Sequence, residues 1–183
     1  MTSIKEKKWR LFFALWPSET ECTALASWQP LLHELCHGRV MRPATLHVTL
    51  VFLGEVAENR LEALQLAAQE VDFQRFNLEL LEARYWGHNH IVYAASEVIP
   101  SQHTSLVNEL ESKLLNHRFK FEQRPYKPHV TLLRNAQWSD APLPRQSKVC
   151  WQMSDFVLVQ SRSDEQGACY EVLARFSAKT DSL

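Results

Sequence analysis

The sequence predicts an α+β fold with two pseudo-symmetric lobes, each a mainly antiparallel sheet with outer helices. One observation is a repeat: residues 42–50 and residues 124–132 both read Arg-Pro, three further residues, then His-Val-Thr-Leu. The other is that a strand, a helix, a short strand and the motif strand are expected in the same order in both halves. We therefore expect residues 1–183 to form a single bilobal domain of duplicated halves, with the functional cleft between the lobes.

Composition bounds the class of protein and its partners. The 183 residues are 45% hydrophobic and 22% charged, which is typical of a globular domain. The formal net charge is -1, so bulk electrostatics do not favour long duplex nucleic acid or an anionic membrane as a partner. A small anionic ligand held by a local basic patch remains compatible with this charge.

Cysteine usage and the N-terminal residues indicate the compartment. No two of the four cysteines form a Cys-x-x-Cys pair, so we expect reduced thiols in a cytoplasmic protein. The apolar run Leu11–Trp16 stops at Pro17, which is too short for a signal sequence or a membrane span. We expect a monomer that does not contact membranes. The cysteines are Cys22, Cys36, Cys150 and Cys169.

Periodicity and helix signals define the elements of the first half. Trp9–Trp16 is an apolar strand that Pro17 ends. Ser18 with Glu21 forms a capping box, which begins one helix that ends at Gly38. The apolar stripe of this helix is Leu25, Trp28, Leu32 and Leu35. The next expected elements are a short strand at 39–41, a motif strand at 46–53 stopped by Gly54, a helix at 58–71 and an alternating strand at 76–85.

The second half follows a turn at 86–89. Its helix, expected at 101–117, carries Leu106, Leu110 and Leu114 on one face. The other expected elements are a strand at 90–96, a short strand at 119–123, a motif strand that ends at Leu132, a Pro-rich loop at 137–148 and a hairpin of strands at 151–161 and 170–176.

The repeated strands predict a chemical site. Successive strand residues face opposite sides, so His47 shares a face with Thr49, and His129 with Thr131. Histidine titrates near neutral pH, and two facing imidazoles suit acid–base catalysis without a metal. Threonine hydroxyls can donate hydrogen bonds to oxygens that carry negative charge, so the set fits a phosphoryl centre. The alternative is that His-Val-Thr-Leu is an ordinary amphipathic strand and its repeat a relic of duplication.

These residues resemble the twin signatures of the 2H phosphoesterases. The resemblance lies in 47–50 with 52–55 and in 128–134, and segments 10–15 and 170–173 extend it over most of the chain. The branch is that of the RNA 2′,3′-cyclic phosphodiesterases, also called 2′-5′ RNA ligases. One departure from the family pattern is the segment 42–45 before the first motif.

The resemblance implies an activity and a role for each residue. Such enzymes open a 2′,3′-cyclic phosphate on RNA ends to leave a 2′-phosphate, with no metal or nucleotide cofactor, and they join tRNA halves through 2′-5′ linkages. His47 and His129 match the catalytic histidines, with His129 expected as base and His47 as acid. Thr49 and Thr131 match phosphate-binding residues, and Arg134 matches a substrate contact.

A local basic patch fits an RNA end as the partner. Glu122 is the only acid between residues 118 and 134. By resemblance, Phe12 and Phe13 are candidates for stacking a base, although core packing is the alternative for each. The basic residues of the patch are Arg118, Lys120, Arg124, Lys127 and Arg134.

Other functions remain open at this stage. His33-Glu34-Leu35-Cys36-His37 matches the His-Glu-x-x-His string of zinc proteases, but no third ligand accompanies it, and a solvated helix end is the alternative. The same paired histidines would also suit a small cyclic nucleotide or ADP-ribose 1″,2″-cyclic phosphate. A non-catalytic module that binds RNA ends is the remaining alternative, and it would not need paired acid–base groups.

Overall fold

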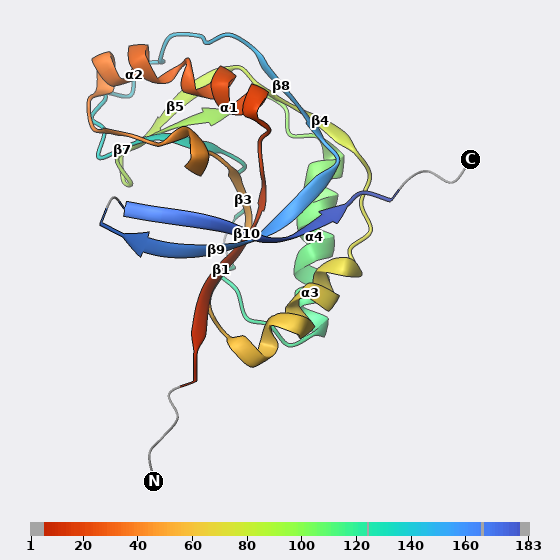
Figure 1. Ribbon diagram of the computed structural model, residues 1–183. Coiled ribbons are helices and arrows are strands. Elements are labelled where there is room, and N and C mark those ends of the chain that lie inside the picture. Colours follow the sequence, from red (N-terminus) through yellow and green to blue (C-terminus); the bar gives the residue numbers. More distant parts are fainter. Residues whose placement is uncertain (1–5, 124, 166, 180–183) are drawn as a thin grey trace.

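The structure is a computed structural model that describes residues 6–123, 125–165 and 167–179 (Figure 1). The strands are β1 (Lys8–Leu15), β2 (Arg39–Val40), β3 (Val48–Ala57), β4 (Phe76–Leu80), β5 (Glu82–Trp86), β6 (Ile91–Ala95), β7 (Val130–Arg134), β8 (Val149–Met153), β9 (Asp155–Asp164) and β10 (Gly167–Ser177). The helices are α1 (Glu19–Ala26), α2 (Gln29–Cys36), α3 (Leu61–Gln69) and α4 (Ser101–Asn116), with short 3₁₀ turns η1 (Pro43–Thr45) and η2 (Glu58–Arg60).

The predicted α+β fold with antiparallel sheets is confirmed. Over the described residues the main sheet has the order β10-β9-β1-β3-β7-β6-β5, with β2 paired to β7, and β4 and β8 form a separate pair. The two motif strands β3 and β7 share a single residue pair, Val48 with Val130. The sheets expected for the two lobes are thus joined at one residue pair between the motifs, and the antiparallel strands β3 and β7 run away from it in opposite directions.

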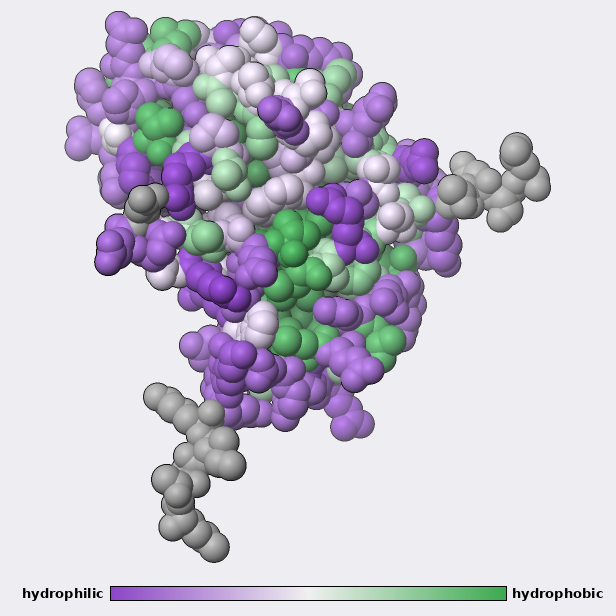
Figure 2. Space-filling view, viewed as in Figure 1, coloured by the Kyte–Doolittle hydropathy of each residue, from purple (hydrophilic) through white to green (hydrophobic). Residues whose placement is uncertain are grey.

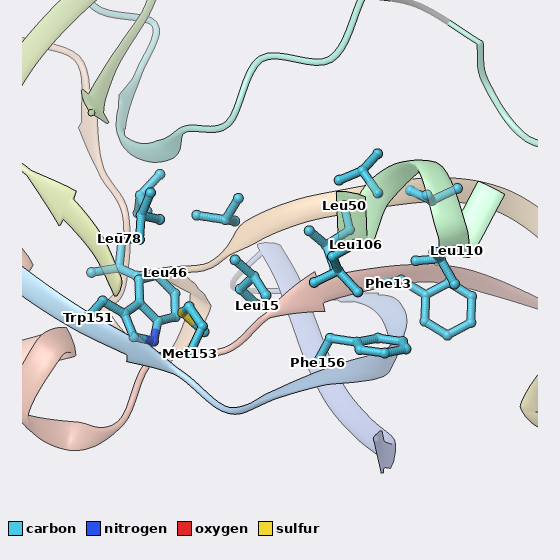
Figure 3. Packing of buried hydrophobic residues seen from close by; sticks show 14 of the residues in the cluster. Phe13, Leu15, Leu46, Leu50, Leu78, Leu106, Leu110, Trp151, Met153 and Phe156 are labelled. Atoms are coloured by element: carbon cyan, nitrogen blue, oxygen red, sulfur yellow. The ribbon is translucent and has the colours of Figure 1, made fainter. Parts of the chain in front are cut away.

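Alternation along the strands separates a core face from a site face. On β1, Leu11, Phe13 and Leu15 belong to the main core, while Phe12 and Ala14 pack into a separate cluster on the opposite face. Figure 3 shows the core side chains of β1 packed with those of α4 and β3. All four helices contribute residues to this core, and α3 and α4 lie side by side (Figure 1). The other face of the sheet is left for the site.

In each half, the segment that precedes the motif also forms backbone hydrogen bonds with the motif strand of the other half. The first-half strand β2 pairs with β7, where Arg39 lies opposite Arg134. In the second half, the amide of Glu122 donates a hydrogen bond to the carbonyl of Phe52 on β3, with an N–O distance of 3.2 Å. These connections cross between the halves beside the motifs.

The helix expected from Ser18 to Gly38 is two helices. The predicted capping box of Ser18 and Glu21 is present, but α1 ends at Ala26 and α2 begins at Gln29. Pro30 is the second residue of α2; it has no N–H to donate backwards, and its ring disfavours a continuous helix. The buried stripe consequently ends at Cys36, whereas Leu35 is only half-buried.

Three strand boundaries also differ from the expectation. The motif strand does not stop at Gly54: β3 continues to Ala57, because Gly54, with φ +72°, accommodates a bulge opposite β1. The strand expected at 76–85 is interrupted at Leu81, and β4 and β5 belong to different sheets. The first strand of the expected hairpin, 151–161, is likewise divided between β8 and β9, so the hairpin is β9–β10.

The short strand expected at 119–123 is not a strand. The preceding helix α4 ends in a Schellman motif, in which Phe119 N–H bonds to the carbonyl of Leu114 and Arg118 N–H to that of Leu115. Arg118 has φ 60° there. The chain after this turn runs beside β3 and makes the single backbone bond from Glu122, so it does not form a ladder.

The surface matches a globular domain. Figure 2 shows a mostly hydrophilic face with one hydrophobic area near its centre, where β10, α3 and α4 lie in Figure 1. No helix within the described ranges is both long enough and apolar enough to cross a membrane.

Candidate active site

The two motifs meet in one cavity on the site face of the sheet. His47 and His129 immediately precede β3 and β7, and the Val48–Val130 pair sets these strands side by side. The cavity has a volume of about 240 Å³. All five residues that the sequence singled out line it: His47, Thr49, His129, Thr131 and Arg134.

Both imidazole rings are held in the same way. Nδ1 of His47 lies 2.8 Å from the carbonyl oxygen of Thr45, and Nδ1 of His129 lies 2.7 Å from that of Lys127. A carbonyl can only accept, so Nδ1 carries the proton in each ring and Nε2 carries the lone pair of the neutral form. Nε2 of His47 lies 3.0 Å from the hydroxyl oxygen of Thr49, which donates to it. Either ring can therefore accept a proton at Nε2 or, once charged, donate one from it.

The electrostatics of the cavity favour an anion. Within the described residues its lining includes Arg10 and Arg134 beside the two histidines, and no carboxylate. The pKa of His47 is lowered to about 4, chiefly by burial and also by the nearby charges of His129 and Arg134, while the hydrogen bond to Thr45 acts in the opposite direction. His47 is thus neutral at pH 7 when the cavity holds no anion.

Aromatic rings pack against both histidines. Trp16 stacks on His47 with ring centroids 5.5 Å apart, and Phe12 and Tyr170 lie 5.0 and 5.3 Å from it. On the other side, Trp86 lies 4.7 Å and Tyr93 5.6 Å from His129, both edge-on. These contacts restrict the rotation of both imidazoles.

Comparison with known proteins decides the family. The family model described as "LigT like Phosphoesterase" matches residues 15–93 and 95–170, so each matched segment contains one motif. The chain belongs to the LigT-like phosphoesterases. The predicted membership of the 2H phosphoesterases is therefore confirmed.

Relatives of this LigT-like phosphoesterase have named activities. Proteins named "RNA 2′,3′-cyclic phosphodiesterase" from Escherichia coli (strain K12) and Thermus thermophilus are each 30% identical to it, and it covers 96% and 90% of their lengths. The alignments span 92% and 93% of this chain. The crystal structure of E. coli LigT complexed with 3′-AMP superposes with a TM-score of 0.83 at 27% identity, covering 95% of this chain and 100% of that one.

Two alternatives that the sequence left open do not fit the structure of this phosphoesterase. Phe13 is fully buried in the core and cannot stack a base, whereas Phe12 lines the cavity. The zinc-protease string does not form a site, because α2 ends at Cys36 and His37 has φ 55°, outside the helix. His33 Nε2 lies 3.1 Å from the Gly38 carbonyl oxygen. No three His, Cys, Asp or Glu side chains are grouped as metal ligands anywhere in the described ranges.

The residues of the predicted basic patch do not all lie at the site. Lys127 and Arg134 line cavities at the site, but Arg118 and Lys120 line neither. Arg124 lies outside the described residues.

Six lining residues of the cavity were not anticipated as site residues: Arg10, Met41, Thr45, Phe52, Ser161 and Tyr170. Arg10 could have been predicted from the sequence, because it lies two residues from Phe12 on β1 and therefore faces the same side of the sheet. Ser161 and Tyr170 could not, because they reach the site only through the pairing of β9 with β1 and of β10 with β9.

Proposed function

We propose that this phosphoesterase opens the 2′,3′-cyclic phosphate at RNA ends to a 2′-phosphate by two-histidine acid–base catalysis that needs no metal. The observation that carries the proposal is that two imidazoles, each fixed through Nδ1 to a carbonyl two residues earlier, line one cavity with two threonines and Arg134, and that no described carboxylate lines it. The RNA substrate comes from the names of the relatives.

In the proposed reaction, water attacks phosphorus in line with the 3′-oxygen. Nε2 of His129 takes a proton from the water as the new P–O bond forms. The bond from phosphorus to the 3′-oxygen breaks, and Nε2–H of His47 gives its proton to that oxygen. His129 ends charged and His47 neutral, and the product carries a 2′-phosphate and a 3′-hydroxyl. A 5′-hydroxyl of RNA in the place of water gives a 2′-5′ linkage by the same steps.

The assignment of His47 as acid requires it to gain a proton before this step. Its pKa is low in the empty cavity, where burial and positive neighbours disfavour the charged ring. A phosphodiester anion beside the ring favours the charged form. The anion also competes for the hydroxyl of Thr49, which then donates to a phosphate oxygen instead of to Nε2. Substrate binding and protonation of His47 are thus coupled in the proposed mechanism.

We further propose a cytoplasmic enzyme that acts as a monomer. The described residues of a single chain bring both motifs into one cavity, which fits a monomer. The four cysteines are unbridged thiols, which fits a reducing compartment.

The direct test is to incubate the protein with a short RNA that ends in a 2′,3′-cyclic phosphate, in buffer with excess EDTA. We expect turnover equal to that without chelator and a product end that co-migrates with an authentic 2′-phosphate standard and not with the 3′-phosphate. His33→Ala, on the zinc-protease string, serves as a control and should leave turnover unchanged. Loss of activity in EDTA that added zinc restores would refute the metal-free mechanism.

A further inference from the structure

A second cavity of about 750 Å³ continues from the one around the histidines. The two cavities share Thr49, Phe52, His129, Thr131 and Arg134. The second lies beside residues 49–52 of β3, and the segment 125–127 and the end of β5 also line it. A water molecule occupies roughly 30 Å³ in the liquid, so this volume greatly exceeds what a water nucleophile needs.

The lining of the second cavity combines an aromatic ring with a cation. Trp86, half-buried at the end of β5, contacts the ring of His129. The ammonium of Lys127 lies 4.9 Å from the centroid of the Trp86 ring, and its side chain is exposed. Among the described residues no carboxylate forms an ion pair with Lys127. The ammonium lies over the face of the ring, and an exposed lysine of this kind can turn toward a phosphate of single-stranded RNA while a base takes its place on the ring.

The second cavity differs from the first in its polar groups. Two carboxylates, Glu111 and Glu122, line it, and burial raises the pKa of Glu111. Carboxylates disfavour a bare phosphate but accept hydrogen bonds from the N–H groups of a base. The mixture of aromatic, cationic and acidic groups therefore fits a whole nucleotide better than an isolated anion.

We propose that the second cavity is a nucleotide subsite of the RNA substrate, occupied by a nucleotide other than the one that carries the cyclic phosphate. Its base lies against Trp86 and its phosphate contacts Lys127. The proposal rests on the proposed function. The nucleotide has two possible sources: the upstream neighbour in the same strand, or the first nucleotide of a 5′-hydroxyl strand that is being joined.

The test compares kcat/KM for a nucleoside 2′,3′-cyclic phosphate with that for a dinucleotide carrying the same cyclic end. The variants are Lys127→Met and Trp86→Leu. The matched control is Arg10→Met, which also removes one positive charge. The Arg10 guanidinium lies 4.9 Å from the centroid of the Phe52 ring, as Lys127 lies over Trp86, but Arg10 lines only the first cavity. A second arm adds a 5′-hydroxyl dinucleotide and measures the 2′-5′ joined product.

For the upstream source, we expect the wild type to prefer the dinucleotide by about tenfold, which is the scale of one stacked base. Lys127→Met and Trp86→Leu should reduce this preference to near unity, while Arg10→Met slows both substrates and preserves it. If instead the two variants lose only the joined product, the subsite belongs to the acceptor strand.

If neither variant changes the preference for the dinucleotide or the rate of 2′-5′ joining, the proposed subsite is wrong. The proposed function would survive that result, because the mononucleotide would still be opened to its 2′-phosphate. Failure to open either substrate would refute the proposed function itself.

Discussion

Arg134 lies at the junction of the two cavities and is exposed. Within the described ranges no carboxylate pairs with its guanidinium, so the group is available for a phosphate. We expect Arg134→Ala to lower kcat/KM for the cyclic substrate by on the order of 10- to 100-fold, because charge-assisted hydrogen bonds are lost. Steady-state kinetics and a thermal melt measure this, since folding should be unaffected.

The control for Arg134 is Arg118→Ala. Arg118 lies at the end of α4 and lines neither cavity, so its loss should change kcat/KM much less. Equal losses for the two variants would contradict the placement of Arg134 at the substrate.

His47 should set the acidic limb of the pH profile, because the active form holds one proton on the two histidines and the second proton binds at the ring with the lower pKa. The kcat/KM profile reports the free enzyme, in which the pKa of His47 is lowered to about 4. Activity should therefore persist well below pH 6.5 and fall only near pH 4. Arg134→Ala removes one positive neighbour and should move this limb upward, whereas Arg118→Ala should not. A wild-type limb near pH 6.5 would be inconsistent with a desolvated His47.

Among the elements, those that could be predicted are those that local chemistry determines. The β-branched motif strands follow from period-two alternation, which also separates Phe12 from the core residue Phe13. Pro30 marks the break in the first helix, but the capping box and the apolar stripe predict one continuous helix. Gly54 was misread because a glycine that ends a strand and one that forms a bulge look alike until the register of β1 is known.

The site residues that could not be predicted depend on tertiary pairing. Tyr170 contacts His47 from β10, and Trp86 contacts His129 from β5. Neither position has a local signal, because its proximity to a motif requires the register of one or two intervening strands. The second cavity has the same origin, since its lining combines residues 49–52 of β3 with the segment 125–127 ahead of β7.

Helix α4 is tied to the segment before His129 by a hydrogen bond between the buried His103 and the half-buried Tyr126. Nε2 of His103 lies 2.8 Å from the hydroxyl of Tyr126, and burial lowers the pKa of His103 to about 4. The unfolded chain, with a pKa near 6.5, binds more protons between pH 6.5 and pH 4. The contribution of His103 to the free energy of unfolding is therefore complete above pH 6.5 and falls by up to about 3 kcal/mol as the pH approaches 4.

His103→Gln should flatten this dependence in denaturant unfolding measured from pH 4 to pH 7. Tyr126→Phe is the control: it removes the hydrogen bond but leaves His103 buried, so the slope with pH should remain. An unchanged slope in His103→Gln would assign the acid sensitivity to other groups.

The molecule as a whole assembles one site from two halves. Each segment matched by the family model contains one His-x-Thr strand, and the strands meet at the Val48–Val130 pair. The exchange of connecting segments, β2 to β7 and residue 122 to β3, links the halves on both sides of the cavity. Descent from a duplicated unit stays a prediction, but the resulting arrangement has a kinetic consequence that can be measured.

Because one histidine from each half is proposed to act on the same phosphorus, the two should behave as a unit. His47→Ala or His129→Ala should each lower kcat by about 10³-fold or more, and the double variant should cost little beyond either single one. Thermal melts of all three variants serve as the folding control. Near-additive losses would show that the halves contribute independently.

The same variants decide which half supplies the acid. A substrate whose 3′-leaving group is chemically activated needs no proton on that oxygen, so it should restore much of the rate to the variant that lacks the acid. With His47 as acid, His47→Ala is rescued and His129→Ala is not, because deprotonation of the water still requires its base. Rescue of His129→Ala alone would exchange the two roles and would agree with the neutral state of His47 in the empty cavity. Wild-type-like turnover of the ordinary substrate by either variant would rule out the two-histidine mechanism.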